Sequence, residues 1–186
     1  MNPLVSLAKA AVENFTKENK VISPAPDISE EFLKQKAGVF VTIENAGSLR
    51  GCIGTYLPSQ ENICKEVIQN AIAAAAEDYR FESIKKEELP FLSYAIYILG
   101  EPELVKDISE LNPKKYGIIV KSQGFSSTDV IFNPAPSPYQ KTGILLPNLE
   151  KIDTAEQQID IACQKGGIDQ ILENIIIYRF EAKKYQ

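Results

Sequence analysis

The chain has 186 residues, of which 44% are hydrophobic and 24% are charged, and its formal net charge is −5. This composition is typical of a globular protein, and the length suits one sizeable domain or two small lobes. The acidic balance and the lack of any block of basic residues count against nucleic acid as a partner, because binding to phosphates requires clustered Lys and Arg.

The chain contains no histidine. Histidine-based triads and zinc or iron sites are therefore excluded, and acid–base chemistry would fall to Asp, Glu, Lys, Tyr or Cys. The three cysteines, Cys52, Cys64 and Cys163, form no C-x-x-C pair, so we expect neither a disulfide framework nor a zinc site. A hard metal such as magnesium, held by carboxylates, stays possible, but nothing in the spacing of the carboxylates indicates one. The apolar stretches are too short to span a membrane and the first residues do not resemble a signal peptide. We expect a soluble, cytoplasmic protein.

The first helix is predicted from Asn2 and Pro3, an N-cap followed by proline at the first helical position. Its apolar residues recur at helical spacing, so this helix should pack inward. After a loop with prolines, Asp27 and Glu30 are a candidate capping box for a short helix that Gly38 would end.

A β-hairpin is predicted next. Residues 39–43 are β-branched and aromatic, which predicts a strand, and 45–47 (NAG) is a turn sequence. The segment 49–54, LRGCIG, should therefore return as the second strand. A long alanine-rich helix follows Pro58 and runs to about Glu77.

Four further strands are expected. Residues 91–99 are apolar on both faces and should form a central strand, and the others are expected at 117–120, 144–146 and 175–180. Between the last two, Thr154 and Gln157 form a capping box for a helix that Gly166-Gly167 would close in left-handed geometry.

The stretch from Gln123 to Thr142 contains three prolines and is expected to be a long exposed loop between two strands, which is commonly a functional or mobile feature. Helices and strands alternate unevenly, and the hairpins imply antiparallel pairing. The pattern therefore predicts an α+β fold, and no glycine motif for a dinucleotide or for ATP is present.

The segment LRGCIG is the first candidate for chemistry. Arg50 and Cys52 are two residues apart on a strand and should share a face, where the guanidinium would favour the thiolate. Gly51 and Gly54 leave the backbone open to a ligand or to a bulge. In the alternative interpretation, Cys52 is a small buried residue and the glycines allow tight packing.

Two further candidates with charged side chains lie where helices are expected to end. Asp78 and Arg80 either terminate a helix as a surface ion pair or face the hairpin and orient an anionic substrate. Lys165 either stabilises the end of its helix or binds a ligand. Cys64 and Cys163 lie on apolar helical faces and are expected in the core.

Six ordered blocks that span the chain resemble the AMMECR-one domain family, also described as protein A of the AmmeMemoRadiSam system. The blocks are FVTIE (40–44), LRGCIG (49–54), DYRF with EELP (78–81 and 87–90), YGIIV (116–120), LLPNL (145–149) and CQKGGI (163–168).

The resemblance implies that residues 1–186 form one AMMECR-one-like domain. It would have two unequal α+β subdomains with largely antiparallel sheets and packed helices, both termini in the larger, and the motif residues between them. The family has a short hairpin where this chain has the proline-rich loop at 123–142. The resemblance assigns no activity and no cofactor, but the system name implies Memo-like and radical SAM proteins as partners.

Two functions stay open from the sequence. One is an enzyme that acts on an unidentified small molecule in a cleft, with Cys52 and Asp78 as catalytic residues. The residues that would bind its substrate are Arg50, Gly51, Gly54, Arg80 and Lys165. The other is a non-catalytic accessory module that binds partner proteins.

Overall fold

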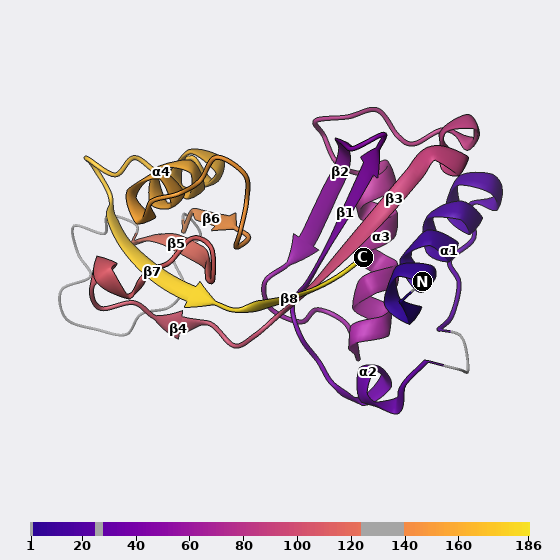
Figure 1. The fold of residues 1–186 in the computed structure, drawn as a ribbon, viewed down its shortest axis with the longest axis horizontal. Coiled ribbons are helices and arrows are strands. Elements are labelled where there is room, and N and C mark those ends of the chain that lie inside the picture. Colours follow the sequence, from indigo (N-terminus) through magenta and orange to yellow (C-terminus); the bar gives the residue numbers. More distant parts are fainter. Residues whose placement is uncertain (1, 25–27, 124–139) are drawn as a thin grey trace. The chain divides into compact units, whose positions relative to one another are not determined.

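The structure, a computed structural model, describes residues 2–24, 28–123 and 140–186. The chain divides into two compact units (Figure 1). Unit 1 comprises Met1–Gly100 and Lys183–Gln186, and unit 2 comprises Glu101–Ala182. Each unit combines helices with a mainly antiparallel four-stranded sheet. The predicted α+β class is therefore confirmed, as are the two unequal parts with both termini in the larger.

The sheet of unit 1 has the strand order β2-β1-β3-β8. Its strands are β1 (Val39–Asn45), β2 (Ser48–Thr55), β3 (Leu92–Leu99) and β8 (Ala182–Tyr185). The interior position of β3 confirms the prediction of a central strand. The short, Lys-rich strand β8 was not predicted. Strand β2 forms one edge of the sheet.

The hairpin of β1 and β2 is also confirmed. Ala46 and Gly47 form its two-residue turn, and both have positive φ, 50° and 78°. Positive φ at both positions is the geometry of a type I′ turn, whose twist matches that of the flanking strands. The turn thereby sets the antiparallel register beside it, in which Asn45 lies opposite Ser48 and Glu44 opposite Leu49.

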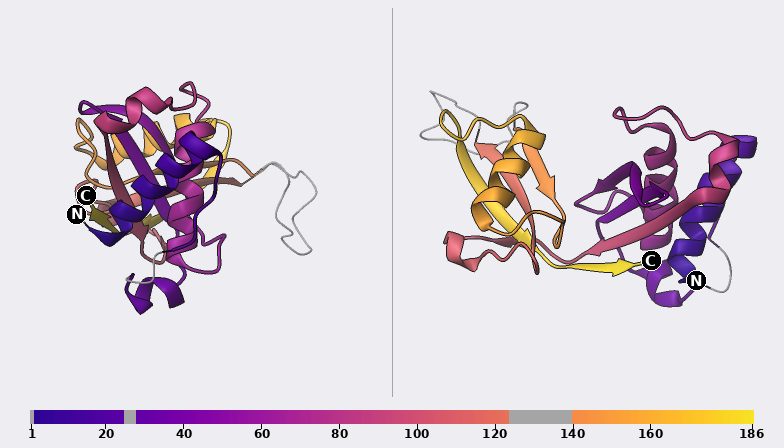
Figure 2. Two further views of the ribbon diagram at one scale, coloured as in Figure 1. Left: turned by 90° about the vertical axis from the view of Figure 1, so that its right-hand side faces the viewer. Right: turned by 45° about the horizontal axis from the view of Figure 1, so that its top comes forward.

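Helices α1 (Pro3–Glu18) and α3 (Ile63–Ala76) lie side by side over one face of this sheet (Figures 1 and 2). The side chain of Asn2 caps α1 by accepting a hydrogen bond from the Leu4 N–H at 3.0 Å, as predicted. The core fills the space between these helices and the sheet. From the sheet, β1 contributes Val39, Val41 and Ile43, all fully buried.

The short helix α2 (Glu30–Lys34) differs from the prediction at both ends. Ser29 directly precedes it and is its cap, because the hydroxyl accepts a hydrogen bond from the Glu31 N–H at 3.4 Å. Asp27, the predicted cap, lies outside the described residues. The helix ends before Gly38, which instead packs so closely on β2 that a Cβ would lie 2.6 Å from the Thr55 carbonyl oxygen.

Unit 2 has a sheet with the strand order β4-β7-β5-β6. Its strands are β4 (Glu103–Leu104), β5 (Gly117–Gln123), β6 (Thr142–Leu145) and β7 (Asn174–Phe180). The last three confirm the predicted strands, while β4 is too short to leave a pattern. Among the described residues there are also two 3₁₀ helices, η1 (Lys86–Phe91) in unit 1 and η2 (Ile108–Glu110) in unit 2.

Helix α4 (Ala155–Gly166) packs on β5 and β6. Thr154 and Gln157 form the predicted capping box, and Gly167 ends the helix at φ 63°. Of the predicted loop 123–142, Gln123 belongs to β5 and Thr142 to β6, and residues 124–139 lie outside the described part. None of the helices in the described ranges is long and apolar enough to cross a membrane.

Candidate functional site

The segment LRGCIG forms most of the edge strand β2 and contains a β-bulge. Gly51 lies opposite Ile43 and Leu49 lies opposite Glu44, which leaves Arg50 as the extra residue. A bulge interrupts the regular alternation of side chains. The two-residue spacing of Arg50 and Cys52 therefore does not give them the shared environment that the sequence predicts.

Asp78 and Arg80 cover the outer edge of this strand. The Cys52 N–H donates a hydrogen bond to Asp78 Oδ2 at 2.9 Å, and Arg80 Nη2 donates to the Cys52 carbonyl oxygen at 3.3 Å. These are the two main-chain groups that a neighbouring strand would bind. We call this arrangement of Asp78, Arg80 and the main chain of Cys52 the edge clamp.

The two side chains of the edge clamp also bind each other. Arg80 donates to Asp78 through Nε at 2.9 Å and through Nη2 at 2.7 Å. Asp78 is only 4% exposed, so the pair is not the surface ion pair of one sequence interpretation. It faces the hairpin, as the other interpretation requires, although its role in orienting an anion stays a prediction.

The charge state of Asp78 follows from these contacts. The hydrogen bonds from Arg80, together with the one from the Cys52 N–H, outweigh the effect of burial and lower the pKa of Asp78 to about 2. A carboxyl group with this pKa stays ionised at neutral pH and is a poor proton donor or acceptor there. The contacts with Arg80 thus favour the ionised form of Asp78, and its acid–base role stays a prediction.

Arg50 is paired with a carboxylate on the segment that leads into β3. Its Nε and Nη2 donate to the two carboxylate oxygens of Glu88, at 2.7 and 3.0 Å, and Nη1 donates to the Glu82 carbonyl oxygen at 2.8 Å. The hydrogen bond to Glu88 raises the pKa of Arg50 and lowers that of Glu88. The charge of Arg50 is thus compensated within the protein, and binding of an anionic substrate by it stays a prediction.

The ring of Phe81 lies close to both guanidinium groups. The distance from its centroid to Cζ is 5.4 Å for Arg80 and 5.9 Å for Arg50. An aromatic face attracts a cation at this range, so the ring helps to hold both arginine side chains in place. Phe81 links the edge clamp to the Arg50–Glu88 pair.

The thiol of Cys52 is half-buried on the face of the sheet opposite α1 and α3, next to Thr42, whose hydroxyl oxygen lies 3.4 Å from the sulfur. The hydrogen bond to Asp78 is the main cause of the raised pKa of Arg80, and the neighbouring Cys52 makes a smaller contribution. Tyr97 of β3 is the other neighbour. Burial raises the pKa of Tyr97, and negative charge on Cys52 and Glu44 adds to this effect. A catalytic role for Cys52 stays a prediction.

Gly51 and Gly54 sit where the structure leaves no room for a side chain. A Cβ on Gly51 would lie 2.1 Å from the Ala74 carbonyl oxygen of α3, and one on Gly54 would lie 2.2 Å from the Phe40 ring. These contacts agree with the packing interpretation. The predicted binding of substrate by the two glycines is untested.

The remaining predicted residues lie on helices. Lys165 is in the last turn of α4 in unit 2, whereas Arg50, Cys52, Asp78 and Arg80 come together in unit 1. Cys64 and Cys163 are buried in the cores of units 1 and 2, as predicted, and burial raises the pKa of both thiols.

A buried carboxylate on α3 was missed from the sequence. Glu66 is fully buried, and its oxygens accept hydrogen bonds from the Thr55 and Ser59 hydroxyls at 2.6 and 2.8 Å and from the Ser59 and Gln60 N–H groups at 2.8 and 2.7 Å. Burial alone would raise the pKa of Glu66, but these hydrogen bonds lower it overall. Glu66 and Asn70 interrupt the apolar face of α3 at i, i+4 spacing, and that interruption was the available signal.

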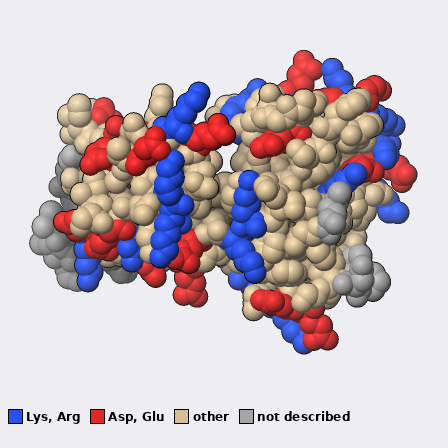
Figure 3. Space-filling view, in the orientation of Figure 1, with Lys and Arg blue, Asp and Glu red and all other residues tan. Residues whose placement is uncertain are grey.

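The charged surface and the metal-ligating side chains single out no further site. On the displayed face of each unit, Lys and Arg side chains are interspersed with Asp and Glu (Figure 3). Within residues 2–24, 28–123 and 140–186, no three or more Cys, Asp or Glu side chains are grouped so that they could hold a metal ion.

The fold and the edge clamp thus define an α+β protein with two units. Each unit has a mainly antiparallel sheet, and in the larger unit an edge strand is covered. The model of the AMMECR1 family matches residues 5–185, and the chain belongs to this family. This finding confirms the resemblance carried by the six sequence blocks.

Three similar proteins illustrate the family. The chain is 42% identical over 186 residues to a protein of Thermotoga maritima, covering all of this chain and 98% of that one. It is 38% identical over 186 residues to protein CA_C1420 of Clostridium acetobutylicum, but it spans only 36% of that longer relative. The crystal structure of the uncharacterized protein PH0010 from Pyrococcus horikoshii matches with a TM-score of 0.81 and 28% identity, covering 97% of this chain and 88% of that chain.

Proposed function

We propose that this protein is a non-catalytic accessory module that binds other proteins, with Memo-like and radical SAM proteins as its partners. The observation that carries the proposal is the pairing of the polar motif residues with one another. Asp78 and Arg80 bind each other and the main chain of Cys52, and Arg50 binds Glu88. A cytoplasmic location, expected from the cysteine usage, is part of this proposal.

Exposed apolar side chains near these pairs support a role in binding. Tyr79 lies between the two residues of the edge clamp and is 93% exposed, and Phe91 at the end of η1 is 69% exposed. Large aromatic side chains are enriched in the contact surfaces of proteins. The length of CA_C1420 adds support, because there the region similar to this chain is joined to further sequence.

Binding of the purified chain to purified Memo-like and radical SAM proteins of the same organism tests the proposal by biolayer interferometry. We expect a complex with at least one of them, and we expect Cys52→Ser to leave its affinity unchanged. Tyr79→Ala is the variant that tests the surface and should weaken the complex. Tyr79 is exposed, so its truncation should not alter the core. If neither partner binds the wild-type chain, the proposal is wrong.

The alternative is an enzyme for a small molecule, with a cleft built on LRGCIG. The half-buried thiol of Cys52 supports it, because the residue lies beside Arg80, whose guanidinium donates a hydrogen bond to the Cys52 carbonyl oxygen. This alternative requires Cys52 to react with iodoacetamide faster than free glutathione does at neutral pH. Labelling at or below the rate of glutathione, measured by mass spectrometry, would remove its chemical basis.

A further inference from the structure

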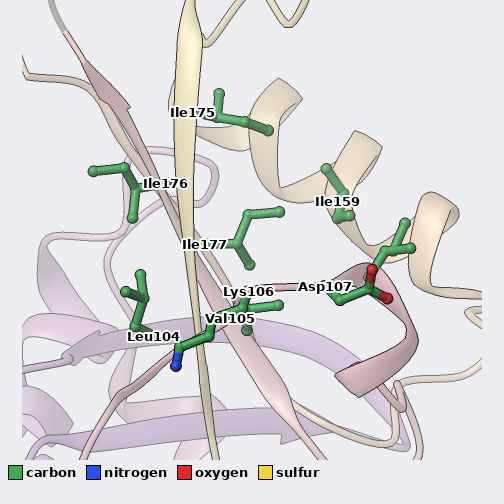
Figure 4. A pocket seen from close by; sticks show the side chains of 9 residues that line it. Leu104, Val105, Lys106, Asp107, Ile159, Ile175, Ile176 and Ile177 are labelled. Carbon is green, nitrogen blue, oxygen red and sulfur yellow. The ribbon is translucent and has the colours of Figure 1, made fainter.

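Unit 2 contains a hollow of about 350 Å³ beside β7 (Figure 4). Three consecutive residues of this strand, Ile175, Ile176 and Ile177, line it together with Ile159 of α4 and residues 104–108. Ile175 and Ile177 point towards α4 and Ile176 points to the other side (Figure 4). Because successive side chains of a strand occupy opposite faces, a hollow lined by all three lies beside the edge of the strand.

The main chain of Ile175 faces this hollow. In the neighbouring strand β5, the Ser122 N–H donates to the Lys141 carbonyl oxygen at 3.0 Å, so the main-chain groups of Ser122 point towards β6. Ile175 lies opposite Ser122 in the register of β5 and β7. Residues that face each other in this way do not exchange hydrogen bonds, so the N–H and C=O of Ile175 point away from β5.

The strand that would pair with Ile175 ends too early. Val105 donates its N–H to the Ile177 carbonyl oxygen at 2.9 Å, which continues the pairing of β4 with β7. Two residues later the chain has turned into η2, and the Asp107 N–H donates to Glu110 Oε1 at 3.1 Å. The place beside Ile175 that a longer β4 would occupy is therefore the hollow itself.

We infer that an extended segment of a partner protein binds in this hollow as an added strand, antiparallel to β7 and in line with β4. This inference names a binding surface for the proposed accessory module and rests on that proposed function. The main chain of the added segment would supply the partners for the N–H and C=O of Ile175. Addition of a strand to an open sheet edge draws affinity from such main-chain hydrogen bonds and specificity from the flanking side chains.

The side chains around the hollow define the chemistry of the segment. On the α4 side the lining is apolar, with Ile159, Ile175 and Ile177, so the segment should place apolar residues there. On the other side the Lys106 ammonium group lies near Leu104, as Figure 4 shows, and Lys106 has no ion-pair partner among the described residues. The segment should therefore alternate apolar residues with a residue that carries a carboxylate opposite Lys106.

The carboxylate of Asp107, next to Lys106 in the chain, already forms a hydrogen bond within the protein. Asp107 Oδ1 accepts a hydrogen bond from the Ser109 N–H at 2.8 Å and caps η2. Its carboxylate lies on the α4 side, away from the Lys106 ammonium group (Figure 4). The charges of Lys106 and Asp107 thus lie on opposite sides of the added strand and fix its rotation about its own axis.

A phage library of random peptides tests the inference, with peptides of about seven residues, long enough to form one strand. The full chain is the bait, and the variant Ile175→Pro is used to remove peptides that bind elsewhere. Proline at this position removes the N–H that faces the hollow and leaves the bonds of β7 to β5 intact. We expect enriched peptides that alternate apolar residues with a Glu or Asp.

The affinity of an enriched peptide, labelled with fluorescein, is then measured by anisotropy. Ile175→Pro should weaken binding by about tenfold or more, because the hydrogen bond is lost. Ile175→Ala is the matched comparison, because it removes most of the same side chain but keeps the N–H, so Ile175→Pro should weaken binding more than Ile175→Ala does. Equal binding by the wild-type chain and Ile175→Pro, or no enrichment from the library, overturns the inference.

A charge exchange provides a second measurement that does not depend on proline. Lys106 is exposed, so Lys106→Glu should fold normally, and it should weaken binding of the acidic peptide by about fivefold. The same peptide with Lys in place of its acidic residue should bind Lys106→Glu better than wild type. If the charge exchange has no effect, the assigned position of Lys106 is wrong.

Three further outcomes separate this inference from its alternatives. If the wild-type chain is a dimer in solution and Ile175→Pro is a monomer, the occupant is a second copy of the chain and the inference is wrong. If the chain binds Memo-like or radical SAM proteins equally well with and without Ile175→Pro, the module role stands and the strand site fails. If the library selects the expected peptides but neither protein binds, the strand site stands and those partners are wrong.

Discussion

The carboxylate of Asp78 accepts a hydrogen bond from the main-chain N–H of Cys52 at 2.9 Å, which joins the segment after α3 to the outer edge of β2. Arg80 completes the contact by binding both Asp78 and the Cys52 carbonyl oxygen. Exposed strand edges invite pairing with other chains, and side chains that satisfy the edge prevent it. Changes to these motif residues should therefore affect stability as well as any function.

The variant Asp78→Asn should lower the free energy of unfolding by about 1 to 3 kcal/mol, because the Arg80 guanidinium loses the charged partner of two hydrogen bonds. Urea unfolding followed by circular dichroism measures the change. Glu61→Gln is the matched control, since Glu61 forms an exposed pair with Lys65 and should contribute little. A loss no greater than that of the control would contradict the edge clamp.

Acid should destabilise the wild-type chain in part through Asp78. Its pKa in the folded state is about 2, below the ordinary value of 3.8, so the folded state favours the ionised form. The resulting contribution of about 2 kcal/mol is present above pH 5 and is lost as the pH falls from about 4 towards 2. Unfolding measured across this range should show a shallower decline for Asp78→Asn than for wild type. Parallel curves would exclude Asp78 as a source of the acid sensitivity.

Gly51→Ala should lower the free energy of unfolding by about 3 kcal/mol, because the added Cβ would collide with the main chain of α3. Gly47→Ala is the comparison. Gly47 has φ +78° and no atom within 4 Å of an added Cβ, so alanine there should cost about 1 kcal/mol through backbone strain alone. Thermal unfolding of both variants gives the order of the two effects. If Gly47→Ala is the more damaging change, the close contact between β2 and α3 is not the reason for glycine at position 51.

Glu66→Ala should lower the free energy of unfolding by about 3 kcal/mol, since it leaves the Ser59 and Gln60 N–H groups without an acceptor. Glu66→Gln should cost less than half as much. Its carbonyl oxygen can accept from the two N–H groups while its amide donates to the Thr55 and Ser59 hydroxyls, which can reverse. Chemical denaturation of both Glu66 variants is compared with that of Glu87→Ala, a control at an exposed position. Equal effects of Glu66→Ala and Glu87→Ala would contradict the buried network.

The features that the sequence predicts correctly are local ones. The cap at Asn2, the turn at residues 45–47 and the capping box at Thr154 each depend on residues within a few positions of one another. Periodicity likewise identified the strands and the buried faces of the helices. The fold class follows from the order of these elements, and the family resemblance supplied the division into two units.

The candidate site depends on contacts that the sequence does not encode locally. Asp78 and Cys52 are 26 residues apart, and Arg50 and Glu88 are 38 apart. The bulge at Arg50 changed which guanidinium lies near the Cys52 sulfur, because the spacing rule assumes a regular strand. The role of Glu66 was hidden for the same reason, since its donors come from the end of β2 and the loop after it.

The strand β8 has a consequence for how the protein is made. Residues 183–186 belong to unit 1, whose other residues end at Gly100, so the whole of unit 2 is synthesised before the sheet of unit 1 can receive its last strand. The interior strand β3 therefore gains its final neighbour only after every strand of unit 2 has been made.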